Sequence, residues 1–418
     1  MMGTVEPMEP TEEEHMSGTV LIIGTLDTKA VEFAYIRDLI TARGHATILL
    51  DAGVDEPKLT PDISAARVAA AGGTTIEALR EAHDRATALA AMCAGARAVA
   101  LELLAEGRFD GVISLGGSGG TAIATAAMKA LPVGMPKVMV STMASGDVSA
   151  YVDVKDITMM YSVVDVAGLN RLSRRILANA AGAVCGMVEQ EIPAAEDHPL
   201  LGATMFGVTT PCVTRVRETL EGAGYEVLVF HAVGSGGRAM EALINDGFIT
   251  GVADVTTTEW ADELIGGVLS AGPDRLDAAG RAGIPQVVSV GALDMCNFGG
   301  IDTVPPQFKD RNLYRHNPQV TLMRTTPEEN AELGRILATK LNAATGPTAL
   351  FLPLRGVSMI DAAGGPFWSP EADAALFDAV RATVDPAKVE LVELDLNVND
   401  PAFADAMTDR LTAMLAAR

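Results

Sequence analysis

One order of segments occurs twice in this chain, and it restricts the fold to a repeated α/β architecture. Apolar strands are expected at residues 19–25, 45–53, 109–117 and 135–145, and again at 203–210, 225–237, 248–260 and 283–294. Helix-like stretches separate them, and the segments 134–136 and 283–285 open the matching fourth strands with Gly-Met-Pro and Gly-Ile-Pro. Strands that alternate with helices predict parallel sheets covered on both faces. The sequence therefore predicts two related Rossmann-like, doubly wound subdomains whose sheets face a cleft.

Composition shifts along the chain predict the domain boundaries. Residues 1–17 are acidic and are expected to form a disordered tail. Residues 18–188 form the first predicted subdomain, 189–202 an acidic linker with two prolines, and 203–418 the second subdomain. Two further strands, at 348–361 and 389–396, and helices near 371–383 and at the C-terminus are expected to extend the second subdomain.

Charge and cysteine content exclude several classes of function. Lys and Arg number 31 against 54 Asp and Glu, a net charge of −23 that disfavours nucleic-acid binding. No run reaches about 18 uninterrupted apolar residues, so no membrane span is expected, and the acidic N-terminus does not fit a signal peptide. The four cysteines lie far apart, without disulfide or metal spacing. These features predict a cytoplasmic protein.

The run Gly116-Gly117-Ser118-Gly119-Gly120, followed by Thr121, allows three interpretations. It fits a glycine-rich loop that binds phosphate at a helix N-terminus, and it also fits the G-x-S-x-G turn of a serine hydrolase. A tight turn without a ligand is the third. A hydrolase needs a histidine, and only His231 and His316 are plausible partners for Ser118, both from the second half. The loop lacks the Gly-Lys-Ser/Thr end of a P-loop, and the first strand lacks G-x-G-x-x-G.

Polar residues also follow the other strands of the first half, where open parallel sheets bind ligands. Asp27, in the segment Gly24–Lys29, could hold a ribose hydroxyl or a metal ion, and Lys29 could pair with a phosphate. The alternative is that Asp27 or Thr28 caps the next helix, leaving a solvated lysine. Asp51 ends the second strand.

In the second half, Glu259, Asp294 and His231 stand at expected strand ends. Glu259 could instead belong to the first turn of a helix. The segment 301–325 is expected to be a long irregular loop, and its cations Arg311, Arg315 and Arg324 lie beside His316. These basic residues suit an anionic substrate, although solvated loop cations would give the same pattern.

Five segments together follow a known pattern in order. GTLDTK, GGSGGTA, TTTEWADELIGG, GALDMCNFGG and RHNPQVTLMRT resemble the ATP-binding family similar to the amino-terminal region of the tomato mosaic virus resistance protein. The resemblance spans roughly residues 18 to 418. It implies two Rossmann-like subdomains, ATP binding with Mg²⁺, and homodimers. Some relatives pair with a barrel resembling phosphoenolpyruvate-using enzymes, so a separate barrel protein is an expected partner.

The resemblance favours a nucleotide at the first half. We expect ATP to contact Gly24, Thr25, Asp27, Lys29, Asp51 and the loop residues Gly116, Gly117, Ser118, Gly119, Gly120 and Thr121. His231 and Arg315 are the expected substrate-binding residues, and His316, Glu259 and Asp294 the expected catalytic residues, with His316 as acid–base. The sequence identifies no metal ligands. Three hypotheses stay open: a Mg-ATP-dependent enzyme acting on a small anionic metabolite, an ATP-controlled regulatory module, and a serine hydrolase using Ser118.

Overall fold

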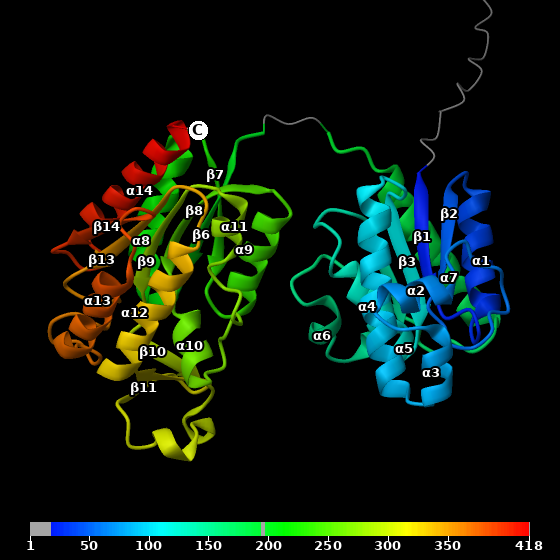
Figure 1. Ribbon diagram of the computed structural model, residues 1–418, viewed down its shortest axis with the longest axis horizontal. Helices are drawn as coiled ribbons and strands as arrows, with labels where there is room; N and C mark the ends of the chain where they lie inside the picture. Colours follow the sequence, from blue (N-terminus) through cyan, green and yellow to red (C-terminus); the bar gives the residue numbers. More distant parts are fainter. Residues whose placement is uncertain (1–17, 194–196, 418) are drawn as a thin grey trace, which may run out of the picture. The chain divides into compact units, whose positions relative to one another are not determined.

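The computed structural model describes residues 18–193 and 197–417. The chain divides between residues 194 and 195 into two compact units (Figure 1), and each is described by itself. The predicted tail, residues 1–17, lies outside the described residues.

A five-stranded parallel sheet forms the centre of the first unit. Its strands are β1 (Thr19–Gly24), β2 (Ala46–Asp51), β3 (Gly111–Gly116), β4 (Lys137–Ser141) and β5 (Thr158–Tyr161). They lie in the order β2-β1-β3-β4-β5, and every neighbouring pair is parallel. All six residues of β3 are buried, because helices cover both faces of the sheet. The carboxyl ends of the strands therefore share one edge.

Helices cover the two faces of this sheet as separate layers. On one face lie α1 (Ala30–Ala42) and α7 (Arg171–Glu189), and on the other α2 (Ala65–Ala71), α3 (Ile76–Ala82), α4 (Arg85–Ala105) and α5 (Ser118–Met128). A short 3₁₀ turn (Thr142–Ser145) and α6 (Ser149–Val152) lie between β4 and β5. Asp84 begins α4 by accepting hydrogen bonds from the amides of Ala86 and Thr87, as an N-cap aspartate does.

Helix α4 is long and apolar enough, by length and composition alone, to cross a membrane, and no other helix of the described residues is. Its buried side chains include Met92, Val99 and Leu103, which pack in the hydrophobic core beneath the sheet. With 33% of its apolar stretch buried, α4 packs one side against the core of the first unit.

The second unit repeats the strand order of the first. Its strands are β6 (Leu200–Met205), β7 (Glu226–His231), β8 (Ile249–Thr256), β9 (Gln286–Gly291), β13 (Thr348–Pro353) and β14 (Val389–Leu394). The strands lie in the order β14-β13-β9-β8-β6-β7, and all neighbouring pairs are parallel. Strands β6, β7, β8, β9 and β13 therefore take the positions that β1, β2, β3, β4 and β5 have in the first sheet. The predicted fold class, α/β with doubly wound parallel sheets, is confirmed.

Helices again cover both faces of the second sheet. One face carries α8 (Thr210–Gly222) and α14 (Pro401–Ala416). The other carries α9 (Ser235–Asn245), α11 (Ala278–Ala282), α12 (Pro327–Asn342) and α13 (Pro370–Thr383). The short helix α10 (Glu259–Ile265) follows β8, and a 3₁₀ turn (Gly207–Thr209) follows β6.

Two expectations about irregular segments are wrong. Most of the predicted loop 301–325 is ordered: two 3₁₀ turns (Ile301–Thr303 and Pro306–Phe308) precede the hairpin β11 (Leu313–Asn317) and β12 (Val320–Arg324), which pairs with β10 (Met295–Phe298) in an antiparallel sheet. The predicted linker 189–202 is too long, because α7 ends at Glu189 and β6 begins at Leu200. Strand β12 is hydrogen-bonded to β10 and β11, and strand β6 to β7 and β8. The local sequence pattern does not show these pairings.

Candidate functional site

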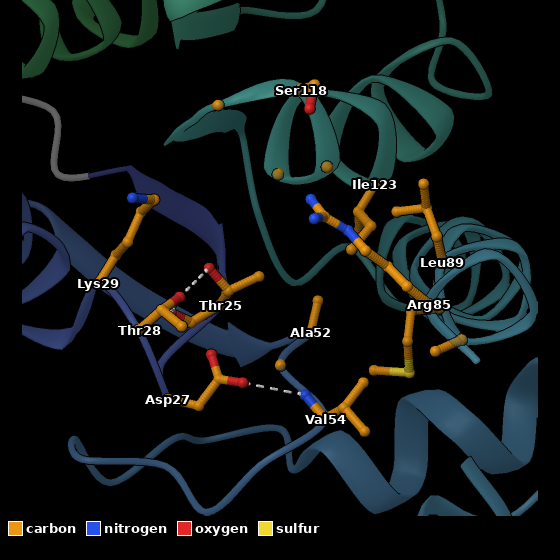
Figure 2. A pocket seen from close by; sticks show the side chains of 16 residues that line it. Thr25, Asp27, Thr28, Lys29, Ala52, Val54, Arg85, Leu89, Ser118 and Ile123 are labelled. Carbon is orange, nitrogen blue, oxygen red and sulfur yellow. Dashed lines mark hydrogen bonds between the residues drawn. The ribbon is translucent and has the colours of Figure 1, made fainter. Parts of the chain in front are cut away.

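A cavity of about 360 Å³ opens in the first unit where β1, β2 and β3 end. The chain crosses from β1 to β2 on one side and returns to β3 on the other, so β1 and β3 flank the point where the strand order reverses. Ligands of doubly wound sheets bind at this point, outside the carboxyl ends of the strands. Figure 2 shows the side chains that line the cavity. Its volume falls in the usual range for small-molecule sites.

The glycine-rich loop forms one wall of the cavity. Helix α5 begins at Ser118, and its N-cap residue, Gly117, has no side chain to satisfy the first backbone amides. Ser118, Gly119 and Gly120 line the cavity, and the helix dipole adds partial positive charge at this end of α5. Gly116 does not line the cavity, and a Cβ at this position would lie 3.1 Å from the Cα of Gly120. The glycines thus allow a tight turn and leave the helix end uncapped.

Thr121, a predicted nucleotide contact, has a structural role instead. It is fully buried, and its hydroxyl donates to the carbonyl of Gly117 and lies 2.6 Å from the hydroxyl of Ser141. These bonds hold the loop after β3 against the end of β4.

Arg85 is a site residue that the sequence analysis missed. It is the first residue of α4, it lines the cavity, and a terminal guanidinium nitrogen lies 3.8 Å from the position that a Cβ on Gly119 would take. Figure 2 shows the guanidinium pointing toward the start of the helix that carries Ser118. Among the residues that the structure describes, it makes no hydrogen bond or ion pair. A free cation therefore lies beside uncapped amides.

Two carboxylates shape the opposite end of the cavity. Asp27 lines it, and its Oδ2 accepts hydrogen bonds from the amides of Val54 and Asp55, both at 3.2 Å. Asp51 lies behind the lining and is fully buried; its Oδ1 accepts from the amides of Leu26 (3.1 Å) and Gly53 (2.9 Å). Burial raises the pKa of Asp51. Within residues 18–193, Asp27 Oδ1 and Asp51 Oδ2 are buried oxygens that have no hydrogen-bond partner.

Gly24, Thr25 and Lys29, three predicted nucleotide contacts, differ in where the structure places them. Thr25 and Lys29 line the cavity, but the Lys29 ammonium donates to the carbonyl of Val166, so it is engaged away from the glycine loop. Gly24 has a packing role, because a Cβ there would meet the Phe33 ring at 2.5 Å. The alternative of a helix cap is also wrong, since α1 has Lys29 as its N-cap residue and no side-chain cap.

Apolar side chains complete the cavity. Leu89 and Met92 of α4, Ile123 of α5, and Ala52 and Val54 after β2 all face it. The cavity therefore has a positively charged end, an apolar wall, and a carboxylate at its far side. A ligand that fits all three carries a phosphate, a flat or apolar group, and a hydroxyl or amine donor.

The second unit also contains a glycine-rich loop, Gly234 to Gly237, but its own side chain occupies it. Glu259 Oε1 accepts hydrogen bonds from the amides of Gly234 (2.7 Å) and Gly237 (3.0 Å), and its Oε2 lies 2.7 Å from Nε of Arg275. Arg275 is buried and also pairs with Asp254 at 2.5 Å. Glu259 has no exposed surface, and the structure gives it an internal ion pair and helix-capping bonds; its catalytic role stays a prediction. It neutralises Arg275 and caps α9.

Asp294, the second predicted catalytic carboxylate, is also fully buried. Ser358 donates to its Oδ2 at 2.8 Å, and burial together with repulsion from Asp361 raises its pKa. Arg324, expected to be a loop cation, bonds Asp373 at 2.7 Å and is nearly buried. These groups form an internal network that stabilises the loops after β9 and β13. They offer no surface to a substrate.

The remaining predicted residues are exposed but are not brought together. His231 ends β7, and its ring packs 5.5 Å from that of Phe206. Arg315 and His316 lie on β11 in the antiparallel sheet. No hydrogen bond or ring contact links His231 to either of them among the described residues.

The serine hydrolase hypothesis finds no partner for Ser118 inside its own unit. Within residues 18–193 the histidines are His45 and His83. His45 is buried between the amide of Gly18 and Glu189, and His83 ends α3. Neither forms a hydrogen bond with Ser118, so the structure adds no support for a nucleophile there.

Comparison with known families covers both units. Residues 18–193 match the N-terminal domain, and residues 198–415 the C-terminal domain, of the uncharacterised protein family UPF0261. The chain belongs to the UPF0261 family. The two family domains coincide with the two units of the structure.

Relatives of this chain include bacterial and plant proteins. A UPF0261 protein of Clostridium tetani is 56% identical over 96% of this chain and 100% of its own length. The ToMV resistance protein Tm-1(GCR237) of Solanum lycopersicum is 46% identical over 73% of this chain and 41% of its own length. Among solved structures, UDP-N-acetylglucosamine 2-epimerase from Rickettsia bellii aligns over 65% of this chain and 79% of its own, with 10% identity and a TM-score of 0.21. That likeness is too low to support a function.

Proposed function

We propose that the first unit binds ATP in the cavity at the ends of β1, β2 and β3. One observation carries the proposal: the uncapped amides of α5 and the free guanidinium of Arg85 meet at one end of a cavity large enough for a nucleotide. Amides at a helix N-terminus bind phosphate because they supply donors and partial positive charge together. In a chain of net charge −23, such a local site is the means of attracting an anion.

The alternative placement, in the second unit, is less favourable. There the amides of Gly234 and Gly237 are already bound to the carboxylate of Glu259. A phosphate could enter only by displacing the buried carboxylate of Glu259, which would break its ion pair with Arg275 and its hydrogen bonds to the two glycine amides. The first unit presents its loop without such a side chain.

Magnesium is proposed to accompany the nucleotide. No group of three or more His, Cys, Asp or Glu that could hold a metal ion occurs among the described residues. Mg²⁺ commonly binds through substrate phosphates and retains several waters. The phosphate oxygens would therefore supply most of its ligands here.

What ATP does in this protein separates two proposals. The first is an enzyme that uses Mg-ATP on a small anionic metabolite, with the exposed His231, Arg315 and His316 as substrate and acid–base residues. The second is a module whose contacts with a partner change when ATP binds. Both proposals are compatible with a homodimer, with a separate barrel protein as partner and with a cytoplasmic location, and all three are themselves proposals. Steady ATP consumption that rises with one metabolite would favour the enzyme.

The experiment is a calorimetric titration of Mg-ATP into the wild-type protein and a Gly119→Asp variant. The variant places a carboxylate between the α5 amides and Arg85, so we expect wild-type binding in the micromolar range and at least a tenfold loss in the variant. Gly186→Asp is the matched control, since it adds the same charge on α7, where nothing lies within 4 Å of the new Cβ. Equal affinity in all three proteins would refute the proposed site. Labelling of Ser118 by a fluorophosphonate would instead support the hypothesis that Ser118 is the nucleophile of a serine hydrolase.

A further inference from the structure

We infer that Asp27 makes the cavity selective for a ribose, by accepting a hydrogen bond from a sugar hydroxyl. This inference rests on the proposed nucleotide site and specifies the class of ligand: a ribonucleotide, as opposed to a phosphate ester without a vicinal diol. Asp27 is proposed to contact the ligand, and Asp51 to act as a positioning residue behind it.

The first argument is the state of the Asp27 carboxylate. One oxygen, Oδ2, is held by the amides of Val54 and Asp55. The other, Oδ1, is buried and has no hydrogen-bond partner among the described residues, although Asp27 lines the cavity. Figure 2 shows one Asp27 oxygen bonded to Val54 and the other free of any drawn bond. A buried carboxylate oxygen without a donor is costly, and a ligand hydroxyl would remove that cost.

The second argument is the position of the two carboxylates in the fold. Asp51 is the last residue of β2, the strand whose end carries the ribose-binding acid in dinucleotide-binding folds. Here Asp51 is fully buried, and its Oδ1 fixes the turns on both sides through Leu26 and Gly53. The carboxylate that lines the cavity is that of Asp27, which the loop after β1 places against the turn that follows β2.

The third argument is Gly53, which leaves room for this carboxylate. A Cβ on Gly53 would lie 2.7 Å from Cγ of Asp27 and 2.8 Å and 2.9 Å from its two oxygens. Any other residue would therefore push the carboxylate out of its present position. The glycine loop and Arg85 lie at the other end of the cavity, so the phosphates and the sugar would occupy separate ends.

The test compares ATP, 2′,3′-dideoxy-ATP and inorganic triphosphate, each with Mg²⁺, by calorimetry. We expect the dideoxy nucleotide to bind the wild-type protein at least about tenfold more weakly than ATP, as for loss of a hydrogen bond to a charged group. Asp27→Asn and Gly53→Ala should bring the two nucleotides to within about twofold of each other. Gly119→Ala, a second glycine of the lining, should weaken both equally and preserve their ratio.

Inorganic triphosphate separates this inference from the proposed function. A variant that binds triphosphate like the wild type has an intact cavity. If such a variant, Asp27→Asn or Gly53→Ala, then binds ATP and dideoxy-ATP with similar affinity, the result supports the assignment. Equal binding of ATP and the dideoxy nucleotide to the wild type would overturn it while leaving the phosphate site in place. Discrimination that persists in both variants would also overturn it. Failure of ATP and triphosphate alike to bind the wild type would instead remove the proposed function.

Discussion

The raised pKa of the buried Asp262 carboxyl predicts that the second unit loses stability as the pH rises. Its side chain lies on α10 without exposure, and its carboxylate accepts hydrogen bonds from the amides of Leu269 and Asn297 (both 3.1 Å) and from Nδ2 of Asn297 (2.7 Å). Despite these bonds, burial raises the pKa of Asp262 from the ordinary 3.8 to about 7. Desolvation of the charged form therefore outweighs hydrogen bonding to it.

The sign and size of the effect follow from proton linkage. Because the folded state holds this proton more tightly than the unfolded chain, the stabilisation is complete below the unfolded pKa of 3.8 and is lost as the pH rises through about 7. A tenfold change in proton affinity is worth about 1.4 kcal/mol, so the whole effect is about 4 kcal/mol. Roughly 2.5 kcal/mol of it falls between about pH 5 and pH 8. Burial also raises the pKa values of Asp294 and Asp373, which act in the same direction.

Tryptophan fluorescence measures this effect in the second unit alone, because both tryptophans, Trp260 and Trp368, belong to it. Urea unfolding should give a falling free energy of unfolding from pH 5 to pH 8. In Asp262→Asn the fall should be smaller by about 2.5 kcal/mol, since an amide does not titrate in this range. Asp302→Asn, at an exposed position, is the control and should behave like the wild type. Identical pH dependence in Asp262→Asn and the wild type would refute the reasoning.

Three further predictions concern the proposed site and its counterpart. Arg85→Ala should weaken Mg-ATP about fivefold, as expected for an exposed charge pair, while Arg97→Ala on the same helix should not; equal affinities would exclude Arg85. Gly237→Ala should lower the free energy of unfolding of the second unit by about 3 kcal/mol, because its Cβ would meet Glu259 Oε2 at 2.1 Å; lost ATP affinity in folded protein would move the nucleotide there. His316→Ala should leave urea unfolding unchanged and slow any steady-state ATP consumption about 100-fold; full turnover would remove His316 as acid–base.

Much of the fold could be predicted because both sheets are buried on two faces. A strand such as β3, with six buried residues, must be apolar throughout, and the sequence shows this directly. The sequence analysis does not predict the hairpin β11–β12, although the turn residues Pro318 and Gln319 separate two strand-like runs. Both strands have only five residues and β11 is largely exposed, so the hairpin lacks a long continuous apolar pattern. Pairing of β12 with both β10 and β11 holds it in place.

The candidate site could be predicted only where a motif carries its own geometry. The loop from Gly116 to Gly120 was found because glycines after a strand and before a helix already imply a tight turn and open amides. Arg85 could not be found, since its helix begins far along the chain and only the packing of α4 against α5 brings the guanidinium to Gly119. For the same reason the sequence does not show that Arg275, 16 positions away from Glu259, lies beside its carboxylate.

The sequence by itself determined the periodic features of this protein: the alternation of strands and helices, its repetition, and the polar and glycine residues at strand ends. These depend on neighbours within a few positions, which local hydrophobic patterning and turn chemistry record. The tertiary structure alone decided which of the two glycine-rich loops has unoccupied amides and which carboxylate oxygens, among the described residues, have no hydrogen-bond partner. Glu259 lies 25 positions from Gly234, whose amide it binds, and Arg85 lies 34 positions from Gly119, beside which its guanidinium sits. Only the packing of whole helices brings these residues together.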